Sequence, residues 1–317
     1  MLISSLPAVH QTEVLKLIVE HPVVGAIRYN TGMASARDPL GTLQKLKDLA
    51  EPLGKPVYVD LKAKQLRVTQ WADVPYGAIV LNHKIEVSPP GSGVVYFRGD
   101  DVCKLREVVS GNEIYVDPLP KYPVGAGQSI NILAPSLKIE GGLLAKDHEY
   151  IRAALELGIT KFMLSFVECR EDVQELEEAI ARHSRGAKSV EDCEIVFKIE
   201  SQKGVEFVSS LTRDNFSEDS PYRLMAARDD LQIHVGLLNM EEAERLIAER
   251  DPRAICASRL LMGLEQGKVT RADLADIELM RSFGYKHFMF SDGISRDHSS
   301  EALPFWQEYA AAKPFED

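Results

Sequence analysis

The sequence has few cysteines and no long apolar run. Its four cysteines among 317 residues include no Cys-x-x-Cys pair, which excludes a disulfide framework and is typical of free thiols in a reducing cytosol. No apolar run reaches the length of about 18 residues that a membrane span needs. No basic N-terminal segment precedes an apolar core, so we predict no signal peptide. These absences together predict a cytoplasmic protein without a membrane partner.

Positive charge is also scarce. The chain has 37 Lys and Arg against 48 Asp and Glu, a formal net charge of −11. No basic stripe with interleaved aromatic residues occurs, so a nucleic acid is excluded as a partner. An acidic enzyme that binds a small anionic substrate needs local positive charge, which a metal ion or a few Arg and Lys side chains would supply.

Glycine-rich phosphate loops are missing as well. Neither G-x-G-x-x-G nor G-x-x-x-x-G-K-[ST] occurs, which argues against an open, doubly wound sheet with a nucleotide at its first turn. Instead, short apolar segments alternate with amphipathic segments of helix length. The expected strands are residues 2–3, 23–30, 56–62, 161–167, 194–200, 223–228, 253–260 and 287–291. Eight apolar strands, each followed by a helix, predict an α/β fold, the closed (β/α)₈ barrel.

The alternation breaks between residues 68 and 135. This region consists of short β-rich pieces separated by Pro- and Gly-rich stretches such as SPPGSG and PLPKYPVGAG. We therefore predict a small, lid-like β domain at 68–135, inserted after strand three into a barrel made of 1–67 and 136–317. Within it, residues 101–109 are a candidate for one short helix.

A lysine and a glutamate lie close together on the fifth expected strand. Lys198 and Glu200 are two residues apart, so their side chains point the same way. Charges are rarely buried unless they are paired or bound to a metal. Two interpretations follow: an ion pair that plugs the end of the barrel, or a metal-binding carboxylate beside a lysine that binds an acid or a phosphate.

Active sites of such barrels lie at the C-terminal ends of the strands. Glu200 and Asp230 follow neighbouring strands, whose backbones run about 4.8 Å apart. Two carboxylates facing one space favour a divalent cation such as Mg²⁺. No His or Cys set has the spacing of a zinc site, and we interpret His234 as a solvated histidine of the rim.

Seven segments of the chain resemble the pyruvate kinase family, in the same order along the sequence. They are GAIRYNTG, VYVDLKAKQLR, EYIRAALELGITKFMLSFVECREDV, IVFKIESQKGVE, LMAARDDL, ICASRLLMGL and VTRADLAD. The resemblance implies divalent-metal-assisted phosphoryl transfer and enolate chemistry on phosphoenolpyruvate or pyruvate, with Mg²⁺ or Mn²⁺ as cofactor and ADP or ATP as a further ligand.

The resemblance also implies roles for individual residues. Lys198 would contact the transferring phosphoryl group or lie near the proton-transfer path, and Arg28 would touch phosphate. The implied substrate-binding residues are Ser165, Asp229, Ser258 and Arg67. The implied metal ligands are Glu200 and Asp230 for the divalent ion, and Asn30 and Asp60 for a monovalent ion such as K⁺.

Other positions depart from the family pattern. Asp229 replaces a glycine, Arg259 replaces a glutamine, and Gly32-Met33-Ala34 replaces Ser-His-Gly, which removes a histidine from the nucleotide side. The metal–enolate half is thus kept better than the nucleotide half. Two alternatives stay open. One is a metal-dependent lyase, aldolase or decarboxylase that acts on a pyruvate-like 2-oxo acid without ADP; the other is a non-catalytic ligand sensor.

The last expected helix is a candidate contact surface for a homodimer. It carries Phe305, Trp306 and Tyr309, and exposed aromatic side chains on one helix favour association. If these three rings were instead buried within the chain, this reason for expecting a dimer would no longer hold.

Overall fold

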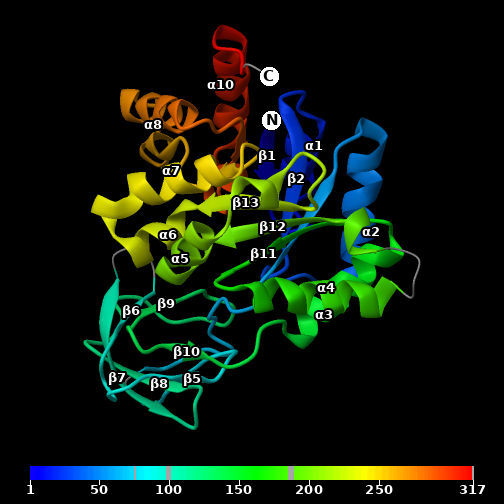
Figure 1. Ribbon diagram of the computed structural model, residues 1–317. Helices are drawn as coiled ribbons and strands as arrows, with labels where there is room; N and C mark the ends of the chain where they lie inside the picture. Colours follow the sequence, from blue (N-terminus) through cyan, green and yellow to red (C-terminus); the bar gives the residue numbers. More distant parts are fainter. Residues whose placement is uncertain (75, 98–100, 185–188, 316–317) are drawn as a thin grey trace. The chain divides into compact units, whose positions relative to one another are not determined.

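The computed structural model describes residues 1–74, 76–97, 101–184 and 189–315 (Figure 1). The chain divides into two compact units. The barrel unit consists of Met1–Leu61 and Ala145–Asp317, and the inserted unit of Lys62–Leu144. The inserted unit leaves the barrel between its third strand and the following helix, as expected from the sequence.

The barrel unit contains a closed sheet of eight parallel strands in the order β1-β15-β14-β13-β12-β11-β3-β2. The strands are β1 (Leu2–Ser5), β2 (Val24–Asn30), β3 (Val57–Leu61), β11 (Lys161–Leu164), β12 (Glu194–Ile199), β13 (Tyr222–Ala227), β14 (Ile255–Ala257) and β15 (His287–Met289). Pairing of Leu2 with Phe288 joins the first strand to the last and closes the barrel. The predicted (β/α)₈ barrel is therefore confirmed.

Alternate side chains of each strand point into the barrel. The interior cluster consists of Ile3, Ala26, Tyr58, Met163, Val196, Met225, Ala227, Ile255, Ala257 and Met289. On β12, Val196 belongs to this cluster, so Lys198 and Glu200 follow it on the same side of the strand. The period of two that packs the interior thus also places the two charged side chains above it.

Helices surround the sheet of the barrel unit (Figure 1). They are α1 (Thr12–Glu20), α2 (Pro39–Ala50), α3 (Ala145–Glu156), α4 (Arg170–Ser184), α5 (Gln202–Ser210), α6 (Arg228–Val235), α7 (Met240–Arg250), α8 (Arg271–Ser282), α9 (Asp292–Asp297) and α10 (Ser299–Ala312). Short 3₁₀ turns are η1 (Glu51–Leu53), η2 (Val190–Asp192), η3 (Arg213–Phe216), η4 (Leu237–Asn239) and η5 (Met262–Gln266). Over the described part of the chain, no helix combines the length and the apolar character that a membrane crossing requires.

The aromatic residues of α10 mostly pack inside the chain. Trp306 is 1% exposed and Tyr309 is 6% exposed. The Trp306 ring contacts those of Phe288 and Phe290, with centroid distances of 5.2 and 5.4 Å. Trp306 and Tyr309 therefore do not form an outward contact surface, although Phe305 is half-buried. A homodimer stays a prediction without support from these two rings.

The inserted unit is a small β domain with its own core. Its strands are β4 (Ile79–Val80), β5 (Ile85–Glu86), β6 (Val94–Tyr96), β7 (Val102–Val109), β8 (Glu113–Asp117), β9 (Asn131–Leu133) and β10 (Lys138–Ile139). Five form an antiparallel sheet in the order β4-β8-β7-β6-β9, and β10 pairs with β5. The helix expected at 101–109 is wrong: Cys103 and Leu105 are buried while Val102 and Lys104 are exposed, which is the alternation of a strand.

Glu194 forms a charge cluster at the start of β12, at the N-terminal end of the barrel. Its carboxylate lies 2.6 Å from Lys161 Nζ and 3.1 Å from Arg223 NH1, and it accepts a hydrogen bond of 2.7 Å from the Tyr58 hydroxyl. Burial alone would raise the pKa of Glu194, but Arg223, Lys161 and Tyr58 lower it to about 2.

This cluster predicts a loss of stability in acid. A carboxylate whose folded-state pKa lies below its unfolded value stabilises the fold above the unfolded pKa and loses that contribution as the pH falls. Glu194 should therefore contribute about 3 kcal/mol at neutral pH, and this contribution should vanish between about pH 4.5 and pH 2. Urea unfolding of the parent and Glu194→Gln across this window measures it. Their stabilities should converge at low pH, and Glu13→Gln, at an exposed site on α1, is the control. If the free energies of unfolding of the parent and Glu194→Gln changed in parallel across this pH window, the prediction would be contradicted.

Candidate active site

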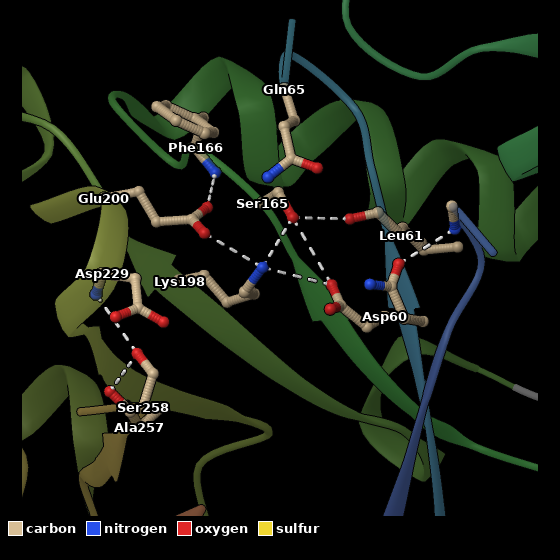
Figure 2. A network of polar contacts seen from close by, with 12 residues as sticks. Asp60, Leu61, Gln65, Ser165, Phe166, Lys198, Glu200, Asp229, Ala257 and Ser258 are labelled. Carbon is tan, nitrogen blue, oxygen red and sulfur yellow. Dashed lines mark hydrogen bonds and ion pairs between the residues drawn. The ribbon is translucent and has the colours of Figure 1, made fainter. Parts of the chain in front are cut away.

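Lys198 is the centre of a buried polar network at the C-terminal end of β12 (Figure 2). Its ammonium nitrogen lies 2.8 Å from Ser165 Oγ, 3.0 Å from Glu200 Oε1 and 3.3 Å from Asp60 Oδ1. The side chain is 5% exposed. Burial alone would lower the pKa of Lys198, but Asp60 and Glu200 raise it. Lys198 is therefore protonated. Its ammonium group links side chains at the ends of strands β3, β11 and β12.

Asp60 joins Lys198 to a second cation, Arg28. The Asp60 side chain is fully buried, and its Oδ2 accepts hydrogen bonds from Arg28 Nε, at 2.8 Å, and from Arg28 NH2. Arg28 NH1 donates to Ser5 Oγ at 2.9 Å and to Asp292. Burial alone would lower the pKa of Arg28, but Asp292 and Asp60 raise it. Both cations of the network thus keep their charge.

Glu200 is held by one cation and one backbone amide. The Phe166 N–H donates to Glu200 Oε2 at 2.7 Å, while Oε1 contacts Lys198 (Figure 2). Phe166 has a φ of +53°, a left-handed conformation that is uncommon for a bulky residue and that clusters at functional sites. Burial, with Asp230 and Asp60 nearby, raises the pKa of Glu200 although Lys198 lowers it. Negative charge is therefore in excess around this carboxylate.

The two aspartates after β13 lie in the first turn of α6. Asp230 is half-buried, and its charge acts on Glu200. Asp229 is more exposed; its backbone N–H donates to Ser258 Oγ at 3.2 Å, and its carboxylate lies 3.9 Å from Arg259 NH1. An acidic side chain in the first turn is favoured by the helix dipole. The sequence-predicted pair of Glu200 and Asp230 is thus brought to one end of the barrel.

The loop after β14 is strained where it meets these aspartates. Ser258, Arg259 and Leu261 all have positive φ values, of 61°, 55° and 57°. Non-glycine residues in this region cost free energy and persist only where the surroundings hold them. The Ser258 hydroxyl donates to Ala257 O at 2.7 Å. The loop therefore presents Ser258 to the start of α6 in a fixed orientation.

Asp292 belongs to the network, although the sequence analysis assigned it no role. It is the first residue of α9, directly after the strand-eight segment, and its Oδ2 accepts from Asn30 Nδ2 at 2.8 Å. Asn30 Oδ1 in turn accepts from the Gly32 N–H at 2.9 Å. The only signal in the sequence was the position of Asp292 at a strand end, which many rim residues share.

The protein-family model described as "Pyruvate kinase, barrel domain" matches residues 69–291 of the chain. The chain belongs to the pyruvate kinase family. This confirms the resemblance on which the residue roles were based.

Curated relatives of this family member share modest identity with it. A pyruvate kinase of Methanocaldococcus jannaschii is 27% identical over 205 residues, which cover 63% of this chain and 42% of the relative. That of Borreliella burgdorferi is 22% identical over 281 residues, 80% of this chain and 55% of the relative. That of Encephalitozoon cuniculi is 30% identical over 274 residues, which cover 79% of this chain and 60% of the relative. The chain spans about half the length of the curated relatives it matches.

The carboxylates of this pyruvate kinase family member fit a hard divalent cation better than zinc. Within the described ranges, no group of three or more His, Cys, Asp and Glu side chains is arranged to hold a metal ion. Mg²⁺ and similar ions need only one or two protein carboxylates, because water and substrate oxygens complete their shell. Glu200 and Asp230 offer that number, and the raised pKa of Glu200, due to burial and then to Asp230 and Asp60, means that added positive charge would be favourable.

Other predicted residues have different surroundings from those expected. Asn30 and Asp60, expected at a monovalent cation, contact Asp292, Arg28 and Lys198 instead; a K⁺ site stays a prediction.

Arg67, a predicted substrate-binding residue, belongs to the inserted unit, where it donates to Gln65 Oε1, at 2.8 and 3.0 Å, and to Gly127 O.

His234 lies beside the network. It is half-buried and packs edge-on against Phe166, with ring centroids 5.7 Å apart, so this histidine of the rim is only partly solvated.

Proposed function

We propose that the chain is a pyruvate-kinase-like enzyme that carries out divalent-metal-assisted phosphoryl-transfer or enolate chemistry on phosphoenolpyruvate or pyruvate. The observation that carries the proposal is the buried network in which Lys198 and Arg28 share Asp60 beside Glu200. Buried charges are costly, and perturbed groups cluster at functional sites. A network of this kind at the C-terminal end of barrel strands is where such enzymes place their chemistry.

Each residue has a role that its contacts support. Glu200 and Asp230 would hold Mg²⁺ or Mn²⁺, which when bound would stabilise negative charge on the reacting oxygens. Lys198 would donate hydrogen bonds from Nζ to the substrate and hold a proton there. Arg28 and Ser165 would bind anionic oxygens, and Ser258 with the Asp229 N–H would bind the substrate carboxylate. Glu200 Oε1, which contacts Lys198, would be the oxygen that turns to the cation.

A second candidate function is a lyase or decarboxylase that acts on a pyruvate-like 2-oxo acid without ADP. Gly32-Met33-Ala34 favours it, because this segment stands where the family pattern has Ser-His-Gly and so removes a histidine from the nucleotide side. We also propose that the chain binds ADP or ATP and K⁺, that it forms a homodimer, and that it is located in the cytoplasm.

Replacing Glu200 by Gln should abolish metal-dependent ligand binding while the fold is kept. The change preserves shape and removes one of two metal ligands, and metal and substrate bind together. Calorimetry with Mn²⁺ and phosphoenolpyruvate should show the loss of binding, and thermal unfolding should show an intact fold. Pyruvate, oxaloacetate and ADP complete the panel and separate the kinase from the lyase.

The matched control is Glu206→Gln, which makes the same change at an exposed position of α5 and should bind like the parent. If Glu200→Gln binds Mn²⁺ and phosphoenolpyruvate like the parent, the Lys198–Glu200 contact is an ion pair that plugs the barrel and the catalytic assignment is abandoned.

A further inference from the structure

Arg28 lies between two carboxylates of different character. Asp60 is fully buried on β3, whereas the Asp292 side chain is 34% exposed at the first position of α9. Asp60 is also held by Lys198 through its other oxygen. Asp292 contacts Arg28 NH1 and Asn30 Nδ2. Asp60 is thus fixed from two sides, while Asp292 approaches Arg28 from the side that reaches solvent.

The contacts of Arg28 leave little capacity for a ligand. A guanidinium has five N–H groups, and four of them donate within the chain: two to Asp60, one to Ser5 Oγ and one to Asp292. An anionic ligand that takes hydrogen bonds from two of these N–H groups must therefore replace one of these acceptors. Asp60 and Ser5 are buried, so Asp292 is the acceptor that can rotate into water.

A structural role at the start of α9 does not account for Asp292. The N-cap of this helix is Ser291, whose Oγ accepts a hydrogen bond from the Ile294 N–H at 3.2 Å. The Asp292 carboxylate is therefore not needed to cap the helix. Its two oxygens instead contact the side chains of Arg28 and Asn30.

We propose that Asp292 acts as an internal competitor for anionic ligands at Arg28. Its carboxylate occupies Arg28 until a ligand oxygen displaces it. A phosphoryl group, with about two negative charges, gains more from Arg28 than a carboxylate with one. Asp292 lowers the affinity for both by the same factor, because either ligand must displace the same carboxylate. This inference rests on the proposed function only in placing an anionic ligand at Arg28.

Replacing Asp292 by Asn should tighten anion binding. Asn keeps the shape and the contact to Asn30 but competes weakly for a guanidinium, since a charge-assisted hydrogen bond is about twice as strong as a neutral one. Calorimetry with inorganic phosphate, and separately with pyruvate, should give dissociation constants about tenfold lower or more for Asp292→Asn than for the parent. Pyruvate should gain about as much as phosphate, because each ligand must displace the same carboxylate in the parent.

Two further variants keep this test decisive. Asp297→Asn removes the same charge from the other end of α9, where Asp297 contacts Arg296, and should leave the dissociation constants unchanged. Asp292→Glu keeps the charge and should not tighten binding. Thermal unfolding checks the fold of each variant.

The outcomes separate this inference from the proposed function. If phosphate binds Asp292→Asn no more tightly than the parent, or binds neither, the competitor role is overturned, whatever Mn²⁺ and phosphoenolpyruvate do. If phosphate binds Asp292→Asn more tightly but the parent shows no metal-dependent binding of phosphoenolpyruvate, the competitor role stands and the proposed function fails.

Discussion

Replacing Lys198 by Met is expected to lower the free energy of unfolding by about 3–5 kcal/mol and to reduce turnover about a thousandfold. The stability loss follows from burial: Glu200 is 2% exposed, and its carboxylate would lose its cation while Asp230 stays nearby. The activity loss follows because the Nζ donor that contacts Ser165, Asp60 and Glu200 is also the donor proposed for the substrate. Urea unfolding and conversion of phosphoenolpyruvate to pyruvate measure the two effects.

The control for this variant is Lys203→Met, at an exposed position in the first turn of α5. It should change the free energy of unfolding by less than about 0.5 kcal/mol and leave turnover near the parent value. Should Lys198→Met keep turnover within tenfold of the parent, Lys198 has no catalytic role. If Lys198→Met had the same free energy of unfolding as the parent, the neighbouring carboxylates would not need the charge of Lys198.

Replacing Arg228 by Met should be the most destabilising change outside the network of Lys198, Asp60 and Arg28. Arg228 is the first residue of α6 and only 5% exposed. Its Nε donates to Glu244 on α7 at 2.7 Å, and its NH1 donates to Asp276 on α8 at 3.0 Å. Removal of one member of a buried ion pair leaves an uncompensated charge, at a cost of about 3–5 kcal/mol.

Urea unfolding measures this cost, with Arg245→Met as the control. Arg245 also pairs with a glutamate, Glu241, but both side chains are about half exposed or more, so its loss should cost less than about 1 kcal/mol. The double variant Arg228→Met with Glu244→Gln should recover part of the stability, since it removes the orphaned charge. A single Arg228→Met variant within 1 kcal/mol of the parent would show that Glu244 and Asp276 are stabilised by other groups.

The sequence predicted the elements of the barrel better than the contacts between them. The apolar period of two on β12 extends to Lys198 and Glu200, so their shared orientation was correct. Local pattern also misled once: a helix was expected at residues 101–109, and the alternating burial of Cys103 and Leu105 shows a strand.

The links between distant residues were not predictable from local sequence. Asp60 lies 138 positions before Lys198 along the chain, and their contact depends on how β3, β11 and β12 align in the sheet. The same holds for Arg28 and Asp292, which are 264 residues apart. The left-handed backbone at Phe166 is set by its hydrogen bond to Glu200 and by packing, neither of which residue type alone indicates.

Closure of the barrel by β1 and β15 has a consequence for synthesis on the ribosome. The two strands pair across almost the whole chain, and the Met1 amino group donates to Lys286 O, 285 residues away. At about 5–20 residues per second, roughly 15–60 s separate the translation of β1 from that of β15. During that interval β1 stays an open sheet edge, and the other edge is whichever barrel strand was translated last; both can pair with other chains. The inserted unit, at residues 62–144, has all its strands translated well before the barrel can close, so the nascent barrel is the part that most needs protection by chaperones.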